Sequence, residues 1–298
     1  MPKDVVSPAW FAEWVLFESN FDPDGLIVAE DTTTILGFVY AVRHRGLSGV
    51  PVDPEGGWIT LGVVDPAARR RGIGTELVER AKVFLRERGS RWAVYSGYPP
   101  AYFLPGLDAD AYPDGLRLLR RAGFETTSRP VAMSRPLDTY RLPEVVASRR
   151  AARHAEGYVV RPATDDDIPD VISVAATQLA PDWGEIIRQA VVRSGRADRV
   201  VLARSPEGAV AGFAIYGAFR ADVSRFGPFG VVGRYRGLGL GTIILHVTLE
   251  RMREHGAEHA WFLWTGTQTP AGQLYLTSGF TITRTFHVMR ADLTDPTP

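Results

Sequence analysis

Arg69-Arg70-Arg71-Gly72-Ile73-Gly74 and Arg236-Gly237-Leu238-Gly239-Leu240-Gly241 are two copies of the pattern R-x-x-G-x-G within one chain. Each copy follows an apolar stretch typical of a strand and opens an amphipathic stretch typical of a helix. A glycine-rich turn that enters a helix gathers backbone N–H groups at the positive end of the helix dipole, where a phosphate or pyrophosphate is stabilised. The repeat therefore predicts a duplicated domain and a cofactor that carries a nucleotide.

The segments around the two copies repeat in the same order. Each half contains a hairpin, a strand, the glycine-rich turn, a helix, another strand and a short helix that ends at Gly-Phe. In the first half these are predicted at 26–30, 35–42, 58–64, 75–88 and 92–96, with a short helix ending at Gly123-Phe124. In the second half they are predicted at 200–203, 210–219, 226–232, a helix to Gly256, 260–265 and 272–277, with a last strand at 280–289.

The two halves also differ in ways that set the predicted domain boundaries. Arg69 and Gly123 are 54 positions apart, whereas Arg236 and Gly279 are 43 apart, and the additional residues fall in the segment 98–112. The second half opens with a strand at 158–161 and a helix capped by Thr164, but the first half has no clear counterpart of either. We therefore predict a partly degenerate N-terminal domain at 1–137, a linker at 138–157 in which 142–154 can form a helix, and a C-terminal domain at 158–298.

Composition narrows the class of protein. The chain has 298 residues, 34 basic and 34 acidic side chains and no cysteine. Zero net charge argues against a general nucleic-acid binder, and the absence of cysteine excludes disulfides, thiolate metal sites and a cysteine nucleophile. No signal peptide and no membrane-spanning run is evident in the sequence, so we expect a cytoplasmic protein without membrane partners.

The order of these motifs resembles the GNAT superfamily of acyl-CoA N-acyltransferases. The second half is similar over its full length, including the opening Arg161-Pro162-Ala163-Thr164, and the first half is similar from about Leu26 onward. Two such halves resemble the tandem arrangement of which mycothiol synthase is an example. The resemblance implies an α/β (α+β) fold with two tandem domains, each a mixed, mostly antiparallel sheet that is splayed at the acyl-CoA site and flanked by helices.

Other nucleotide-binding motifs fit less well. Neither copy completes the dinucleotide fingerprint G-x-G-x-x-G, and no βαβ unit with a following acidic residue is apparent. The Walker P-loop is excluded because its lysine is missing. A plain tight turn with solvated arginines is the structural alternative for each copy.

The resemblance implies acetyl-CoA as co-substrate and no metal. Its expected binding residues in the second half are the strand end and the glycine-rich turn, namely Val231, Arg236, Gly237, Leu238, Gly239, Leu240, Gly241 and Thr242. The matching positions of the first half form a candidate second site, namely Val64, Arg69, Arg70, Arg71, Gly72, Ile73, Gly74 and Thr75.

Two further features carry chemistry in the family. The strand before the turn is bulged in relatives, and the proline and glycines of 227–231 suit a broken ladder here; free N–H groups there would polarise the thioester carbonyl. Tyr275 holds the position of the tyrosine that protonates the departing thiolate in many members. The equivalent residue of the first half, Leu119, cannot donate a proton, so that half is expected to lack catalysis unless Tyr98, Tyr102 or Tyr112 substitutes.

The acceptor side is less specified. The strand at 226–232 has no carboxylate to act as general base, and Asp222, His259 and His287 are candidates by chemistry alone. Aromatic residues in the second half could line an acceptor pocket or pack in the core; these are Trp183, Phe219, Trp261 and Trp264. The acidic run 165–167 reads as a helix N-terminus and not as a metal site.

The leading hypothesis is an acyl-CoA-dependent N-acyltransferase that moves an acetyl group from acetyl-CoA to a primary amine of a small molecule by direct attack in a ternary complex. A non-catalytic acyl-CoA-binding or sensing protein is the alternative, and transfer to a peptide or protein N-terminus ranks below it. We expect no nucleic-acid partner and either a monomer or a homodimer.

Overall fold

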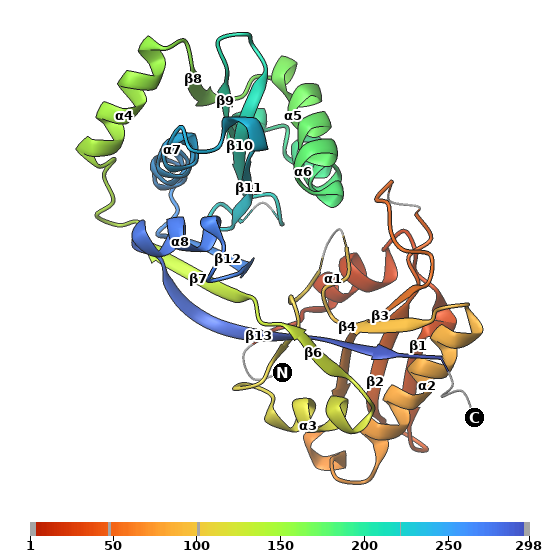
Figure 1. Ribbon diagram of the computed structural model, residues 1–298. Helices are drawn as coiled ribbons and strands as arrows, with labels where there is room; N and C mark the ends of the chain where they lie inside the picture. The colour runs from red at the N-terminus through yellow and green to blue at the C-terminus, as the bar shows by residue number, and fades with distance from the viewer. Residues whose placement is uncertain (1–3, 47–48, 100–101, 221, 295–298) are drawn as a thin grey trace. The chain divides into compact units, whose positions relative to one another are not determined.

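The computed structural model describes residues 4–46, 49–99, 102–220 and 222–294 (Figure 1). The chain divides into two compact units. Unit 1 comprises Met1–Val131 together with Arg284–Pro298, and unit 2 comprises Ala132–Thr283. Both units combine helices with mostly antiparallel strands, which confirms the predicted α/β class.

Unit 1 opens with a short helix, α1 (Pro8–Phe11), which continues as one π-helical turn at Ala12–Leu16. Its strands and helices are β1 (Leu26–Glu30), β2 (Ile35–Val42), β3 (Gly56–Val64), α2 (Ile73–Glu87), β4 (Trp92–Tyr95), β5 (Leu107–Asp108), α3 (Pro113–Arg121) and β6 (Glu125–Ser128). The strands β1, β2 and β3 form an antiparallel meander, and β3 pairs in parallel with β4. The elements predicted from 26 to 96 are confirmed to within two residues.

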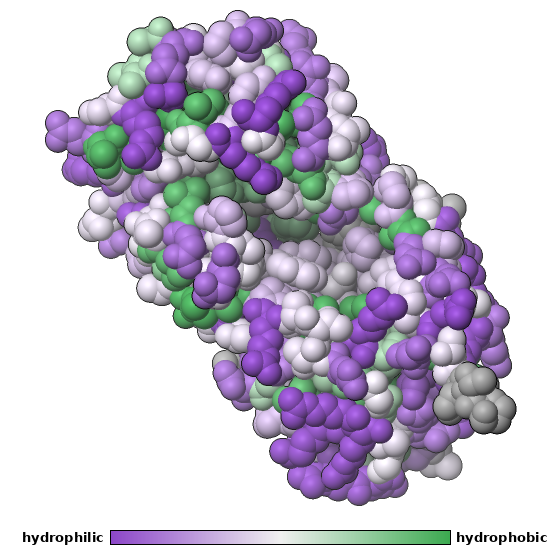
Figure 2. Space-filling model, viewed as in Figure 1, coloured by the Kyte–Doolittle hydropathy of each residue, from purple (hydrophilic) through white to green (hydrophobic). Residues whose placement is uncertain are grey.

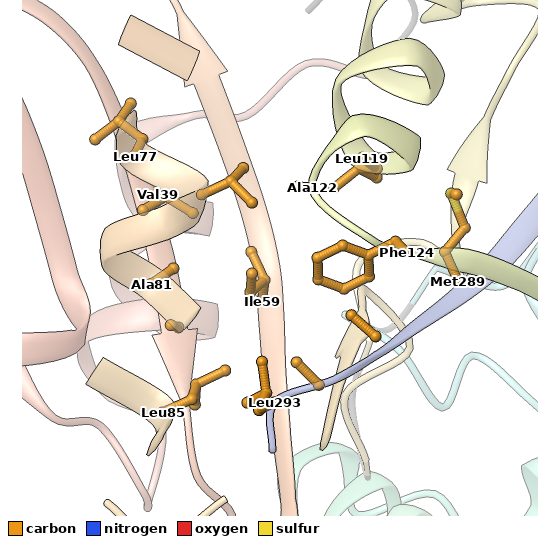
Figure 3. Packing of buried hydrophobic residues seen from close by; sticks show 14 of the residues in the cluster. Val39, Ile59, Leu77, Ala81, Leu85, Leu119, Ala122, Phe124, Met289 and Leu293 are labelled. Carbon is orange, nitrogen blue, oxygen red and sulfur yellow. The ribbon is translucent and has the colours of Figure 1, made fainter. Parts of the chain in front are cut away.

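The core of unit 1 lies between its sheet and the helices α2 and α3. Ile59 of β3, Leu85 of α2 and Phe124 are almost completely buried there (Figure 3). Leu119 of α3 belongs to the same cluster and is 2% exposed. The amphipathic pattern of α2 places apolar residues at helical spacing on one face, and burial of that face stabilises the packing of the helix on the sheet.

Unit 2 contains the second set of elements. They are β7 (Val131–Pro136, beginning at the unit boundary), α4 (Glu144–Ala155), β8 (Val159–Pro162), α5 (Ile168–Val174), α6 (Pro181–Ser194), β9 (Val200–Arg204), β10 (Val210–Tyr216), β11 (Phe226–Val231), α7 (Leu240–Glu254), β12 (His259–Thr265) and α8 (Pro270–Thr277). One antiparallel sheet has the strand order β11-β10-β9-β8, and β12 pairs with β7 outside it. Thr164 and Asp167 form the capping box that the sequence predicts before α5.

The last strand, β13 (Thr281–Asp292), crosses from one unit to the other. Its residues from Arg284 onward belong to unit 1, where Met289 pairs with Tyr95 of β4 in an antiparallel ladder. Arg284 anchors this part, since its guanidinium donates to the buried carboxylates of Asp4 and Asp108. The predicted boundaries at 137 and 158 differ from these units, because they assign the whole last strand to the second domain. The sequence of β13 does not indicate which of two similar sheets the strand completes.

The predicted linker does not lie outside the units. Its residues 144–155 form α4, which belongs to unit 2, packs on α7 and buries the side chain of Val146. Hydrophilic side chains dominate the face of each unit seen in Figure 2, and smaller apolar areas lie among them. No helix in the described part of the chain is long and apolar enough to cross a membrane.

Candidate functional site

The second R-x-x-G-x-G copy connects the end of β11 to the start of α7. Gly237 and Gly239 have φ values of 81° and 76°, in the left-handed region of backbone conformation that favours glycine. Gly239 is the N-cap of α7. Arg236 Nε donates a hydrogen bond to the carbonyl oxygen of Val231 at 3.3 Å, which ties the turn back to the strand.

The first turn of α7 leaves backbone donors without partners. The N–H groups of Leu240, Gly241 and Thr242 lie in the first turn, where no carbonyl of the same helix is available to them. They make no hydrogen bond to another described residue. These donors point along the helix axis at its positive end. The geometry of this turn therefore suits a phosphate or pyrophosphate.

The first copy has the same local geometry in unit 1. Gly72 is the N-cap of α2 with a φ of 84°, and Arg69 Nε donates to the carbonyl oxygen of Val64 at 3.2 Å. The last glycine of each copy also lies against corresponding residues of its own unit. A Cβ added to Gly74 would lie 3.2 Å from Leu118 and 3.6 Å from Val64, and the corresponding neighbours of Gly241 are Leu274 and Val231. Both turns are thus built to one pattern.

In unit 2 the strands β11 and β12 separate beside the turn. Among the described residues, the pairing between them is an isolated parallel bridge from Arg225, just before β11, to Trp261 of β12, and beyond it the two strands belong to different sheets. The ladder of β10 and β11 shifts register between Ala214 and Tyr216, opposite the segment 226–229, so the irregularity expected in β11 is present. In unit 1 the parallel ladder ends at the pair Ile59 and Tyr95, while β3 continues to Val64.

Tyr275 lies on α8 between the two diverging strands. Its ring centroid is 4.4 Å from that of Phe262 on β12 and 5.9 Å from those of Phe226 and Phe229 on β11. The residue is 6% exposed, and burial raises the pKa of its phenol well above the usual range. Its hydroxyl makes no hydrogen bond within the described chain and is not sealed from solvent. A Cβ added to Gly241 at the start of α7 would lie 3.6 Å from Leu274 and 3.6 Å from the ring of Phe229, and that ring also neighbours Tyr275, so α8 lies beside the glycine-rich turn.

Unit 1 has no equivalent phenol on its short helix. Leu119 points into the core toward Phe124 and Met289 (Figure 3). Two of the three tyrosines considered as substitutes are engaged elsewhere: Tyr98 donates to Glu18 Oε1 at 2.6 Å, and Tyr112 donates to a buried aspartate, Asp4, at 2.7 Å. The third, Tyr102, lines a small aromatic pocket where β3 and β4 separate.

The three residues considered as a general base have their described interactions away from Tyr275. Asp222 accepts a hydrogen bond from the backbone N–H of Ser224 within a turn, and His259 is exposed at the first position of β12. His287 belongs to the sheet of unit 1, where its ring is hydrogen-bonded to Thr126 at 3.1 Å. Burial lowers the pKa of His287, which favours its neutral form.

The aromatic residues considered for an acceptor pocket have different environments. Trp183 of α6 packs on Phe213 and lies against Gly230 of the irregular strand, where a Cβ would come within 3.0 Å of its ring. Phe219 and Trp261 hold the guanidinium of Arg225 between them, at 5.1 and 4.4 Å from their centroids. Trp264, by contrast, is 43% exposed. Trp183 is therefore the member of this group that lies beside the predicted thioester-binding strand.

Two features of this region were not found from the sequence. Arg149 of α4 lies over Gly239, and the signal for it is the arginine-rich segment that was interpreted as a linker. His246 of α7 is buried and hydrogen-bonded to Tyr140 and to Ser278 at the end of α8, at 2.9 and 3.2 Å. Burial lowers the pKa of His246 to about 4, so it is neutral at pH 7 and connects α7 to the helix that carries Tyr275.

No cluster of three or more histidine, aspartate or glutamate side chains that could hold a metal ion is present among the residues described here. The acidic run at 165–167 serves the helix start instead. Asp167 accepts hydrogen bonds from Arg161, Arg204 and the backbone of Thr164, and these interactions hold its pKa well below the usual range.

Comparisons with known proteins agree with this geometry. A model of the acetyltransferase (GNAT) family matches twice, at residues 3–102 and 178–280. The chain is 27% identical over 234 residues to a mycothiol acetyltransferase from Saccharomonospora viridis, covering 73% of this chain and 69% of that protein. A mycothiol acetyltransferase from Rhodococcus erythropolis is 39% identical over 75 residues, which is 24% of either chain.

Solved structures share the fold at low sequence identity. A glucosamine N-acetyltransferase region of a fungal multi-domain β-N-acetylglucosaminidase has a TM-score of 0.74 at 19% identity, covering 88% of this chain and 32% of that one. A tandem GNAT protein from the clavulanic acid biosynthesis pathway has a TM-score of 0.62 at 17% identity and covers 93% of this chain and 86% of that one. The chain therefore belongs to the GNAT acetyltransferase family and carries two copies of its domain.

Proposed function

We propose that this protein transfers an acetyl group from acetyl-CoA to a primary amine of a small molecule, with the chemistry in unit 2. The observation that carries the proposal is Tyr275, whose unpaired hydroxyl lies between two diverging strands and beside an intact glycine-rich turn. Unit 1 repeats the turn but has Leu119 in place of the phenol.

The residues of the second turn fit the nucleotide part of acetyl-CoA. The unpaired N–H groups at the start of α7 would bind the pyrophosphate, together with Arg236 and the hydroxyl of Thr242. The irregular strand up to Val231 would bind the pantetheine arm through its backbone, because a disturbed ladder leaves N–H and C=O groups available. Acetyl-CoA, as co-substrate, supplies the thioester whose acetyl group moves to the amine.

The protein's own groups would act at the two ends of this transfer. The amine nitrogen attacks the thioester carbonyl, the C–N bond forms as the C–S bond breaks, and the Tyr275 phenol gives its proton to the departing thiolate. A phenol with a raised pKa is protonated at pH 7 and can donate to a thiolate whose conjugate acid has a pKa of about 8.5. A solvent water or an already neutral amine would take the place of a fixed general base.

Unit 1 has a different role in this proposal. Its turn matches the second one in backbone geometry, so it is a second candidate site for acetyl-CoA through the residues from Val64 to Thr75. Without a phenol on α3, it would bind without catalysing transfer.

The relatives support the choice of acceptor. Two of them are named as mycothiol acetyltransferases, which favours a small-molecule acceptor over a protein. We propose a cytoplasmic enzyme that acts as a monomer or homodimer without nucleic-acid or membrane partners. A non-catalytic acyl-CoA sensor is the alternative, favoured by the aromatic surroundings of Tyr275, since its ring neighbours among the described residues are phenylalanines. Acetylation of a peptide or protein N-terminus is a further alternative, with no specific contact in its favour.

Calorimetry combined with a thiol-release assay tests the proposal. Acetyl-CoA is titrated into the pure protein to obtain affinity and stoichiometry, and thiol release is then followed across a panel of small primary amines. Saturable binding with amine-dependent release supports the enzyme. Binding without release for any amine supports the sensor, and no binding at millimolar acetyl-CoA overturns both.

A further inference from the structure

Arg149, in the middle of α4, lies against the glycine-rich turn of unit 2. If Gly239 had a Cβ, that atom would stand 2.7 Å from Cδ of Arg149, 3.4 Å from Nε and 3.6 Å from Nη1. The side chain of Arg149 thus lies at the N-cap of α7. The helix α4 positions it there because α4 packs against α7 and β8 and buries Val146.

This position is electrostatically costly without an anion. The N-terminus of a helix carries a partial positive charge, which disfavours a nearby cation. Arg149 has no acidic partner among the described residues, and neither has Arg236 in the same turn. The other arginines of α4 are already engaged, since Arg150 donates to the carbonyl of Val160 and Arg153 pairs with Glu156 at 2.7 Å. Arg149 is exposed and free to turn toward a ligand.

The first turn provides an internal comparison. Gly72 holds the same motif position as Gly239, yet nothing lies within 4 Å of where its Cβ would be. The exposed Arg70 there has an acidic neighbour, with Asp114 at 3.8 Å. Among the described residues, a cation supplied by a helix outside the motif therefore lies against Gly239 of the second turn and not against Gly72 of the first.

We propose that Arg149 is a phosphate-binding residue of the second turn, and that its guanidinium pairs with the coenzyme pyrophosphate from outside the R-x-x-G-x-G motif. This inference rests on the proposed function, because it assigns a further contact to the same coenzyme. It makes α4 part of the binding site. The pyrophosphate is the partner because the guanidinium stands at the N-cap of α7, where the unpaired N–H groups converge.

Calorimetry of the full chain with CoA and with 3′-dephospho-CoA tests this contact. Arg149→Gln should weaken both ligands by about 10-fold or more, as expected for loss of a charge-assisted contact. Arg149→Lys should recover part of the affinity, because it restores the charge without the planar fork. Arg188→Gln is the charge-matched control, since Arg188 is paired with Glu185 on α6 and should leave both affinities unchanged.

Salt dependence gives a second readout. The affinity of the wild-type protein for CoA should fall more steeply with salt than that of Arg149→Gln, whereas a purely structural role would lower affinity without changing the slope. Equal affinity of wild type and Arg149→Gln would overturn the proposal while leaving the enzyme hypothesis intact. A loss seen with CoA but not with 3′-dephospho-CoA would also overturn it. No binding by the wild type would overturn the proposed function and this contact together.

Discussion

Replacement of Tyr275 by phenylalanine separates the chemistry from the fold. The substitution removes one hydroxyl and keeps the ring, which contacts Phe262, Phe280 and Phe226 at centroid distances of 4.4, 5.5 and 5.9 Å. That hydroxyl makes no hydrogen bond within the described chain, so its removal breaks no interaction that stabilises the native state. The free energy of unfolding should change by less than about 0.5 kcal/mol.

The expected effect on turnover is much larger. A positioned general acid contributes about 10²- to 10⁴-fold, which corresponds to about 3–5 kcal/mol of activation free energy. At saturating acetyl-CoA and amine, kcat for Tyr275→Phe should fall within that range, while the dissociation constant for acetyl-CoA should stay within about threefold of wild type. Burial raises the pKa of Tyr275, so wild-type kcat should show no loss of this donor below about pH 10.

The assay is thiol release at saturating substrates, with thermal unfolding measured on the same samples. Tyr158→Phe removes a phenol hydroxyl elsewhere in unit 2 and serves as the matched control, with kcat expected to be unchanged. A kcat for Tyr275→Phe within threefold of wild type would refute the assignment of the proton donor. A large fall in melting temperature would refute the argument that the hydroxyl has no structural role.

Three further outcomes are expected. In calorimetry, Arg236→Glu should abolish the tighter acetyl-CoA site, whereas Arg69→Glu should remove only a second site; the opposite result would assign the coenzyme to unit 1. His246 has a folded-state pKa of about 4, below its unfolded value of 6.5, so stability is lost as pH falls from about 6.5 to 4. Relative to His246→Gln, wild type should lose about 3 kcal/mol over that range in urea unfolding, and a constant difference would contradict the burial argument. Arg284→Met removes the cation that pairs with the buried carboxylates of Asp4 and Asp108, so unfolding at pH 7 should become easier by about 3–5 kcal/mol; unchanged stability would show that the pair is dispensable.

The sequence by itself determined the local parts of this protein. The two turns, their helices and the short helix bearing Tyr275 depend on residues close together in the chain, such as the glycines with positive φ at 72 and 239. The capping box at Thr164 was found for the same reason. The geometry of a turn or a helix cap depends on a few neighbouring residues, so it can be recognised from a single sequence. The duplicated domain followed from repetition of these local signals.

Only the tertiary structure decided which distant segments meet. It assigned the second part of β13 to the sheet of unit 1, packed α4 on α7 so that Arg149 covers Gly239, and buried His246 against Ser278. These contacts join residues that are far apart in the sequence. The local sequence around each of them is compatible with more than one position in the fold. A strand of mixed apolar and polar residues such as β13 is compatible with either of two similar sheets. An arginine-rich helix is compatible with an exposed position as well as with a phosphate site. The choice between such alternatives depends on packing and charge summed over the whole unit, which no short stretch of sequence contains.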